Sequence, residues 1–403
     1  MTEKVDVVVV GGGPAGSTTG HLLAAHGHSV LIVDKDRFPR FHIGESLLPC
    51  DLPLFERLGV DMKAGPFLHK QGAEFVDETT GEHAFYDFAD ALPSGARHAY
   101  QVERASFDHA LLLRAERAGA TVQLETRVED IVCDEHQARV TTDRETISAR
   151  FVVDASGQDA FLGRRAKVLE PLKGLGRGAV FCHFSEIDPA IHSELTHLGN
   201  IKVLIRADGW GWMIPLTGRR ISVGFVSNVR AFDPNAPAAM LDEILAASPL
   251  LQRLTVGATR SETRLARNFS YKNRAAAGLR HACVGDAACF LDPVFSSGVS
   301  LGMLGGERLA DELNLALIAG TESDPKALAS FDEHMQHAYR SVGSLVHSFY
   351  NTGLVKNIFF SKTQDPELRS GLISILAGDV WRKDNRFQDM LMRSSRRQMP
   401  QAL

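Results

Sequence analysis

A glycine-rich turn that follows a buried strand constrains the fold of this chain more than any other feature. Residues 5–10 are nearly all valine, a β-branched apolar run typical of a strand inside a parallel sheet. Gly11, Gly13 and Gly16 then fit the pattern G-x-G-x-x-G, with Pro14 and Ala15 in the same turn. These glycines allow a tight turn, close approach of the backbone to a pyrophosphate, and close packing of helix on strand. We expect residues 17–26 to form a helix whose N-terminus faces the phosphates.

A second strand and an acidic residue complete this dinucleotide-binding pattern. Residues 29–33 form the expected strand, and Asp34 follows it, 18 residues after Gly16. The spacing suits an acid that accepts a hydrogen bond from a ribose 2′-hydroxyl. An acid at this position disfavours the 2′-phosphate of NADP. The order of strand, glycines, helix, strand and acid therefore predicts a site for FAD or NAD.

Composition narrows the classes of protein that remain. The chain has 403 residues, of which 44% are hydrophobic and 23% charged, as in ordinary globular proteins of two or three domains. A net charge of −5 argues against a nucleic-acid partner. No apolar run reaches the length of a membrane-spanning helix, so we expect no stable membrane insertion. The five cysteines lack zinc-site or C-x-x-C spacing, which predicts free thiols and no metal site. The apolar run at residues 5–10 lacks the features of a signal peptide, so a cytoplasmic location is expected.

Two downstream segments favour FAD over NAD. Residues 151–157 form an expected strand that ends in a small-residue turn, and residues 281–288 form one that ends in Gly-Asp-Ala-Ala. The second segment resembles that of the flavoprotein monooxygenase superfamily. The resemblance implies that Asp286 lies near the ribityl and pyrophosphate part of FAD. The alternative interpretation is that Asp286 is a plain turn acid or a helix cap.

Further motifs resemble those of the flavin-dependent halogenases, in particular their phenol and pyrrole branch. Residues 40–49 carry R-x-x-x-G-E-S-x-x-P, residues 210–215 carry W-x-W-x-I-P, and residues 292–300 read D-P-V-F-S-S-G-V-S. The resemblance extends from residue 5 to about residue 379. It implies that FAD is contacted by Arg40, Glu45 and Ser46, and by Arg104, which precedes a helix expected over residues 105–118. Arg104 could instead pair with a surface acid.

The same resemblance assigns residues to the reaction. Lys70 lies in the family's K-x-G-A-x-F context, which implies a catalytic lysine that holds hypohalous acid formed from a flavin hydroperoxide and halide. A lone lysine in a polar stretch is otherwise a surface charge. Residues 299–317 are expected to be helical, and amides at that helix start imply halide binding by Ser297 and Gly298 and flavin contacts by Gly298 and Val299. Such amides would serve a contact with flavin alone equally well.

Trp210 and Trp212 are two residues apart, so their rings point to the same face of a regular strand. In the halogenases this motif has been viewed as part of a substrate channel and as a barrier against hydroxylation. Simple packing of two core aromatics on a sheet is an open alternative. Aromatic residues near the C-terminus have the same two interpretations, helix packing or pocket lining, and these are Phe349, Tyr350, Phe359 and Phe360.

The resemblance implies FADH2-dependent chlorination or bromination of an electron-rich aromatic such as a phenol or pyrrole, free or tethered to a carrier protein. It further implies O2 and a halide (chloride or bromide) as reactants, and a separate flavin reductase that supplies FADH2. Phe295 and Ser296 replace a Glu-Ser pair of the tryptophan-halogenase branch, so free tryptophan is not the expected substrate. The main alternative is a single-component FAD-dependent aromatic hydroxylase using NAD(P)H. Two others are a flavin reductase acting on an isoprenoid double bond and a dinucleotide-binding regulator without turnover.

The expected fold class is α/β, with a Rossmann-like FAD-binding domain, an inserted mixed or antiparallel β-sheet domain on the substrate side, and a C-terminal helical region. The FAD-binding domain is expected to be discontinuous, over residues 1–70, 98–170 and 275–330. The sheet domain is expected over residues 71–97 and 171–270, and the helical region over residues 331–403.

Overall fold

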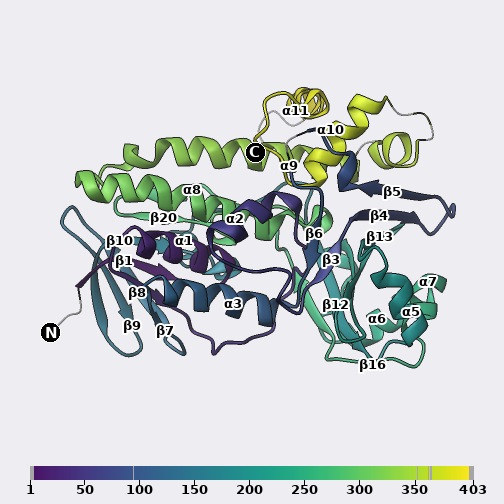
Figure 1. The fold of residues 1–403 in the computed structure, drawn as a ribbon, viewed down its shortest axis with the longest axis horizontal. Coiled ribbons are helices and arrows are strands. Elements are labelled where there is room, and N and C mark those ends of the chain that lie inside the picture. The colour runs from purple at the N-terminus through teal and green to yellow at the C-terminus, as the bar shows by residue number, and fades with distance from the viewer. Residues whose placement is uncertain (1–3, 94, 352, 362, 364, 399–403) are drawn as a thin grey trace.

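The computed structural model describes residues 4–93, 95–351, 353–361, 363 and 365–398. Two eight-stranded sheets lie toward opposite ends of the long axis of the molecule. Two long helices, α8 (Ser297–Ala319) and α9 (Ala329–Asn351), run over the first sheet (Figure 1). Within the described ranges, no helix has both the length and the apolar character needed to cross a lipid bilayer.

The first sheet has a parallel centre, in the order β20-β10-β1-β2-β7, and an antiparallel hairpin that extends from β10. Because parallel strands point the same way, their carboxyl ends meet at one edge, where open α/β sheets bind ligands. The strands are β1 (Lys4–Val10), β2 (Val30–Val33), β7 (Thr121–Gln123), β8 (Val128–Cys133), β9 (Ala138–Thr142), β10 (Thr146–Asp154), β19 (Ala277–Gly278) and β20 (His281–Cys283).

The turn after β1 leads directly into helix α1 (Pro14–Ala25), so the expected start at residue 17 was wrong. Proline suits the first helical position because its φ is fixed and its missing N–H would have no partner there. Gly11 has φ +105°, and a Cβ at this position would lie 2.3 Å from the Ala155 carbonyl oxygen. A Cβ on Gly16 would lie 1.9 Å from the Gly11 carbonyl oxygen. Both glycines are therefore required by the turn itself.

The second sheet is antiparallel except for one parallel pair, β13 with β4. Side chains alternate between its faces: Met213 and Val223 pack in a core with α5, α6 and α7, whereas Trp210 and Trp212 belong to the core on the opposite side. The strands are β4 (Gly72–Asp77), β5 (His83–Asp87), β12 (Arg177–Ser185), β13 (Ile201–Arg206), β14 (Gly209–Leu216), β15 (Arg220–Asn228), β16 (Thr259–Arg260) and β17 (Arg264–Arg267). The helices are α5 (Pro189–Thr196), α6 (Pro237–Ala246) and α7 (Pro249–Thr255).

Two small sheets and the remaining helices complete the fold. Helix α8 begins at Ser297, two residues before the expected start, and the C-terminal part is helical as expected. The small sheets pair β3 (Leu68–Lys70) with β6 (Ala99–Gln101), and join β11 (Leu169–Pro171), β18 (Tyr271–Asn273) and β21 (Cys289–Phe290). The other helices are α2 (Leu52–Arg57), α3 (Arg104–Arg117), α4 (Phe161–Arg165), α10 (Pro366–Leu376) and α11 (Arg386–Gln398).

Candidate active site

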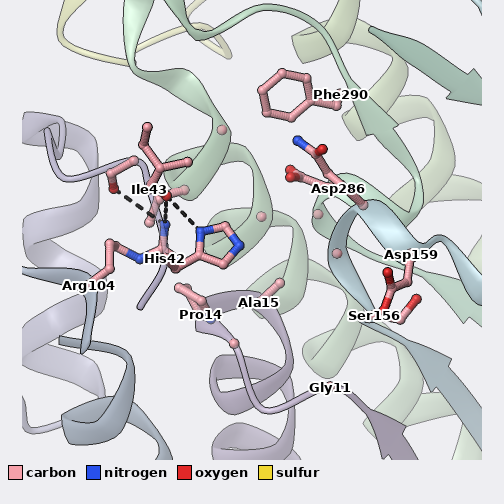
Figure 2. A pocket seen from close by; sticks show the side chains of 18 of the residues that line it. Gly11, Pro14, Ala15, His42, Ile43, Arg104, Ser156, Asp159, Asp286 and Phe290 are labelled. Atoms are coloured by element: carbon pink, nitrogen blue, oxygen red, sulfur yellow. Dashed lines mark hydrogen bonds between the residues drawn. The ribbon is translucent and has the colours of Figure 1, made fainter. Parts of the chain in front are cut away.

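A cavity of about 770 Å³ lies at the carboxyl edge of the first sheet. It extends to the face of the second sheet that carries Trp210 and Trp212. In Figure 2, Arg104 and His42 lie on one side of it, Asp286 and Phe290 on the other, and Pro14 and Ala15, in the first turn of α1, between them. Most residues predicted for the site line this cavity, and these are Gly11, Gly13, Pro14, Ala15, Asp34, Arg40, Glu45, Ser46, Arg104, Trp210, Trp212, Asp286, Gly298 and Val299. Three predicted residues do not line it, and these are Gly16, Lys70 and Ser297.

Asp34 is held at the end of β2 by the glycine turn. One carboxylate oxygen accepts the Gly12 N–H at 2.7 Å, and the other accepts the Asp36 N–H at 2.8 Å. Burial raises the pKa of Asp34, although both backbone hydrogen bonds act in the opposite direction. The carboxylate is thus fixed beside the glycine turn and lines the cavity, where it could accept the predicted hydrogen bond from a ribose hydroxyl.

Two arginines of the cavity share one buried carboxylate. Asp108 is fully buried on α3 and accepts hydrogen bonds from Arg104 Nε and Nη2, at 2.6 and 3.0 Å, and from Arg40 Nη1, at 3.0 Å. Arg104 also donates to the Ile43 carbonyl at 2.6 Å. Charge-assisted bonds of this kind fix a guanidinium in one orientation. Arg104 therefore does not pair with a surface acid, and both arginines are held at the cavity wall.

Asp286 and Glu45 bring two further acids to the cavity from different parts of the chain. Asp286 lies in a short 3-10 helix, Gly285–Ala287, and burial raises its pKa to about 6, opposed by the Arg104 charge. Glu45 is buried, accepts the Gly44 N–H at 3.0 Å, and lies 2.7 Å from His183 Nε2 of β12. Glu45 thereby links the loop after β2 to the second sheet.

Lys70 is a buried residue at the end of β3, with 1% of its surface exposed, and not a surface charge. Its ammonium donates to Ser46 Oγ and to the Leu47 carbonyl, both at 2.9 Å, and lies 5.1 Å from the centre of the Phe88 ring. Burial lowers the pKa of Lys70 to about 7, although the charge of Asp51 acts to raise it. A lysine with such a pKa exchanges its proton near neutral pH.

Ser297, Gly298 and Val299 are the first three residues of α8, so all three lie at the helix N-terminus. Ser296, just before the helix, has φ +56°, and this left-handed residue turns the chain into the helix. Gly298 and Val299 line the large cavity, whereas the buried Ser297 faces a much smaller space together with Phe295 and Ser300. The free N–H groups and partial positive charge of a helix N-terminus suit an anion or an electron-rich ring edge.

Trp210 and Trp212 both line the cavity, with ring centres 6.0 Å apart. Trp212 Nε1 donates to Ser222 Oγ at 3.1 Å. Trp210 Nε1 donates to the Tyr350 hydroxyl at 2.6 Å, which in turn donates to Asp292 at 3.0 Å. The two tryptophan rings thus belong to the core beside the second sheet and also line the cavity, so both interpretations of the motif hold for the same side chains.

Several polar residues of the site were not assigned a role from the sequence. Asp108 had one available signal, because it lies four residues after Arg104 on a helix, a spacing that brings side chains together. Asp51 and His183 had none, and Tyr350 was expected only to pack a helix or line a pocket, because the partners of all three come from distant segments. Phe349, Phe359 and Phe360 are buried in the large core, Tyr350 packs against it, and none of the four lines the cavity, in agreement with helix packing.

Comparison with known proteins identifies the family. The family model described as tryptophan halogenase matches residues 6–95 and 89–390. The 1H-pyrrole-2-carbonyl-(peptidyl-carrier protein) brominase of Pseudoalteromonas luteoviolacea is 30% identical over 419 residues, which cover 98% of this chain and 98% of the brominase. This chain belongs to the flavin-dependent halogenases. It is an oxidoreductase whose activity is flavin-dependent halogenation.

Other relatives agree with this assignment. The tryptophan 2-halogenase of Chondromyces crocatus is 32% identical over 382 residues, covering 90% of this chain and 71% of the relative. The structure of the flavin-dependent brominase Bmp2 matches with a TM-score of 0.86 and 25% identity, over 98% of this halogenase and 99% of that chain. The expected α/β fold, with its Rossmann-like part and second sheet, is confirmed by this match.

Flavin-dependent halogenases use FAD, in its reduced form FADH2, together with O2 and a halide. The residues of this cavity fit FAD. Gly13 caps α1 without a side chain, and the first turn of α1 carries no acid, so its amides are open to a pyrophosphate. Asp34 suits the ribose, while Arg40 and Arg104 supply positive charge along the same wall.

Proposed function

We propose that this halogenase chlorinates or brominates an electron-rich aromatic such as a phenol or pyrrole, with Lys70 holding hypohalous acid for attack by the ring. When bound, reduced FAD supplies the electrons that, with O2 and halide, generate this acid. The observation that carries the proposal is the buried ammonium of Lys70, hydrogen-bonded to a residue of the cavity wall at 2.9 Å. A desolvated cation with a lowered pKa is suited to hold the acid and to exchange a proton with it.

The apolar end of the cavity supports a flat aromatic substrate. Aliphatic and aromatic side chains line it, and these are Ala179, Phe181, Ile201, Trp210, Trp212 and Ile214. An uncharged ring is favoured there, because an unpaired charge in such surroundings is costly. The pyrrole–carrier-protein relative supports a tethered substrate as one form. Free tryptophan is disfavoured, since Phe295 gives its ammonium group no partner at the position where that branch carries an acid.

The remaining assignments form part of the same proposal. The helix N-terminus at Ser297 and Gly298 binds the halide, and Gly298 and Val299 contact the flavin, as the free amides there support. Residues 1–70, 98–170 and 275–330 form the FAD-binding domain, residues 71–97 and 171–270 the substrate domain, and residues 331–403 the helical region. A separate reductase delivers FADH2, and the halogenase acts in the cytoplasm.

The experiment is an assay of the purified halogenase with FAD, NADH, a flavin reductase, chloride or bromide, and a panel of aromatics. The panel contains phenols, free and carrier-bound pyrrole-2-carboxylate, and tryptophan, with mass spectrometry of the products. The expected result is a halogenated phenol or pyrrole only when reductase and halide are present. A product that carries oxygen and no halogen, with NAD(P)H oxidised without the reductase, would instead make the protein a hydroxylase.

A further inference from the structure

Lys70 is separated from the cavity by Ser46. The Lys70 side chain is 1% exposed and does not line the cavity, whereas Ser46, whose Oγ lies 2.9 Å from Lys70 Nζ, does. The Leu47 carbonyl accepts a second N–H of the ammonium at 2.9 Å. The ring of Phe88 flanks the ammonium at 5.1 Å. The ammonium is thus held on several sides and meets the cavity through a hydroxyl group.

The Ser46 hydroxyl has a proton to offer. A serine hydroxyl has one donor and two acceptor positions. Ser46 Oγ accepts from Lys70, and no other hydrogen bond of this oxygen occurs among the residues that the structure describes. Its own O–H therefore has no partner among the described residues, and Lys70 Nζ, at 2.9 Å, is close enough to replace the proton if Ser46 gives it up.

We propose that Ser46 is a catalytic residue of the halogenation, passing a proton from Lys70 to hypohalous acid in the cavity. The proposal rests on the proposed function of Lys70, and in it Lys70 acts on hypohalous acid through the Ser46 hydroxyl and not by direct contact. As the ring carbon attacks the halogen, the carbon–halogen bond forms and the halogen–oxygen bond breaks, leaving its electron pair on oxygen. That oxygen takes the Ser46 proton and becomes water, and Ser46 takes a proton from the Lys70 ammonium. The ring proton then returns through Ser46 to the Lys70 amine, so that arene and hypohalous acid give haloarene and water.

The same geometry disfavours a haloamine on Lys70. Formation of a nitrogen–halogen bond requires the amine nitrogen to contact hypohalous acid. In the structure this nitrogen makes two hydrogen bonds and lies behind Ser46. The charged and titratable groups that act on Lys70 are Asp51 and Cys50, and Asp51 is itself held by the Ser300 hydroxyl at 2.8 Å. Burial lowers the pKa of Lys70 to about 7, so its proton is transferable at neutral pH.

The test is the variant Ser46→Ala, assayed with free FAD, reductase, bromide and the best substrate of the panel. Loss of a proton-transfer group typically costs a factor of about 100 or more in kcat, and we expect such a loss at saturating FAD. Ser46→Thr keeps a hydroxyl and is expected to restore turnover. The control is Ser270→Ala, since the buried Ser270 hydroxyl has no hydrogen-bond partner within the described part of the chain. This control should retain full activity.

Two further measurements separate the relay from other roles. In the wild type, kcat should fall above about pH 7 as Lys70 loses its proton, and this decrease should vanish in Ser46→Ala. Full activity of Ser46→Ala at saturating FAD, or a loss of turnover that added FAD restores, would overturn the relay. So would a peptide mass showing halogen on Lys70. Full activity of Lys70→Ala would instead remove Lys70 and overturn the proposed function as well.

Discussion

The buried charge of Lys70 predicts a measurable dependence of stability on pH, and Lys70→Met is the perturbation that isolates it. Methionine has a similar length and no charge. Burial lowers the pKa of Lys70 from 10.5 to about 7. Each unit of pKa corresponds to about 1.4 kcal/mol, so holding the ammonium in this site costs the folded state on the order of 5 kcal/mol.

The sign follows from which state holds the proton. Below about pH 7 the lysine is charged in both states and the full penalty is present. Between this pH and 10.5 only the unfolded chain is protonated, so stability rises with pH. We expect the free energy of unfolding of the wild type, relative to Lys70→Met, to rise by about 1.4 kcal/mol per pH unit in this window.

The assay is urea unfolding of both proteins between pH 6 and 10, with the difference between them taken at each pH. The difference removes the contributions of cysteines and tyrosines that titrate in the same range and are common to both proteins. The lost hydrogen bonds to Ser46 and Leu47 change the offset of this difference but not its slope. A flat difference would show that the lysine is not perturbed. A difference that falls toward high pH would show that Lys70 is stabilised as an ion, with Asp51 outweighing burial.

Two substitutions test how the cavity wall is held. Asp108→Asn removes the charge that orients two arginines, and loss of charge-assisted bonds worth about 1.5–3 kcal/mol should weaken FAD binding by about 10-fold or more in a fluorescence titration. Glu116→Gln, an exposed change on the same helix, should leave the affinity unchanged, and an unchanged Asp108→Asn would refute the link. Tyr350→Phe keeps the ring but removes the acceptor of the Trp210 indole N–H. The NMR resonance of that N–H should therefore shift, and the free energy of unfolding should fall by about 1–3 kcal/mol. An unmoved resonance would contradict the hydrogen bond.

The glycine turn and its acid could be predicted because their signal is local. The turn needs Gly11 and Gly16 within six residues of each other, and the structure shows the backbone contacts that exclude any other side chain there. Strands β1 and β2, which flank the turn and α1, could also be predicted locally, because both consist largely of β-branched residues. The predicted helix starts were less accurate: α1 begins three residues before its expected start and α8 two residues before its own. In α1 the cause is Pro14, which the expected start placed in the turn although proline favours the first helical position.

The polar partners of the site could not be predicted in the same way. Tyr350 is 140 residues from Trp210 and 58 from Asp292, and no periodicity connects positions so far apart. The three residues meet only because α9, β14 and the turn before α8 converge at one place in the fold. Burial then makes the contact necessary: it raises the pKa of Asp292 to about 7, and the Tyr350 hydroxyl supplies one of its few hydrogen bonds.

Lys70 has a local sequence signal but also depends on contacts with distant segments. Its sequence context made it the candidate for the catalytic lysine, but its energetic state depends on residues 46 and 47 in one loop, on Asp51 at the start of α2, and on Phe88 after β5. A fold gains nothing in stability by desolvating an ammonium in this way, because an apolar side chain of similar size would avoid the penalty. In the proposed function this penalty has a use, because a proton held at a pKa of about 7 is transferable at neutral pH. The position of Ser46, between that proton and the cavity, gives the burial of Lys70 a chemical reason.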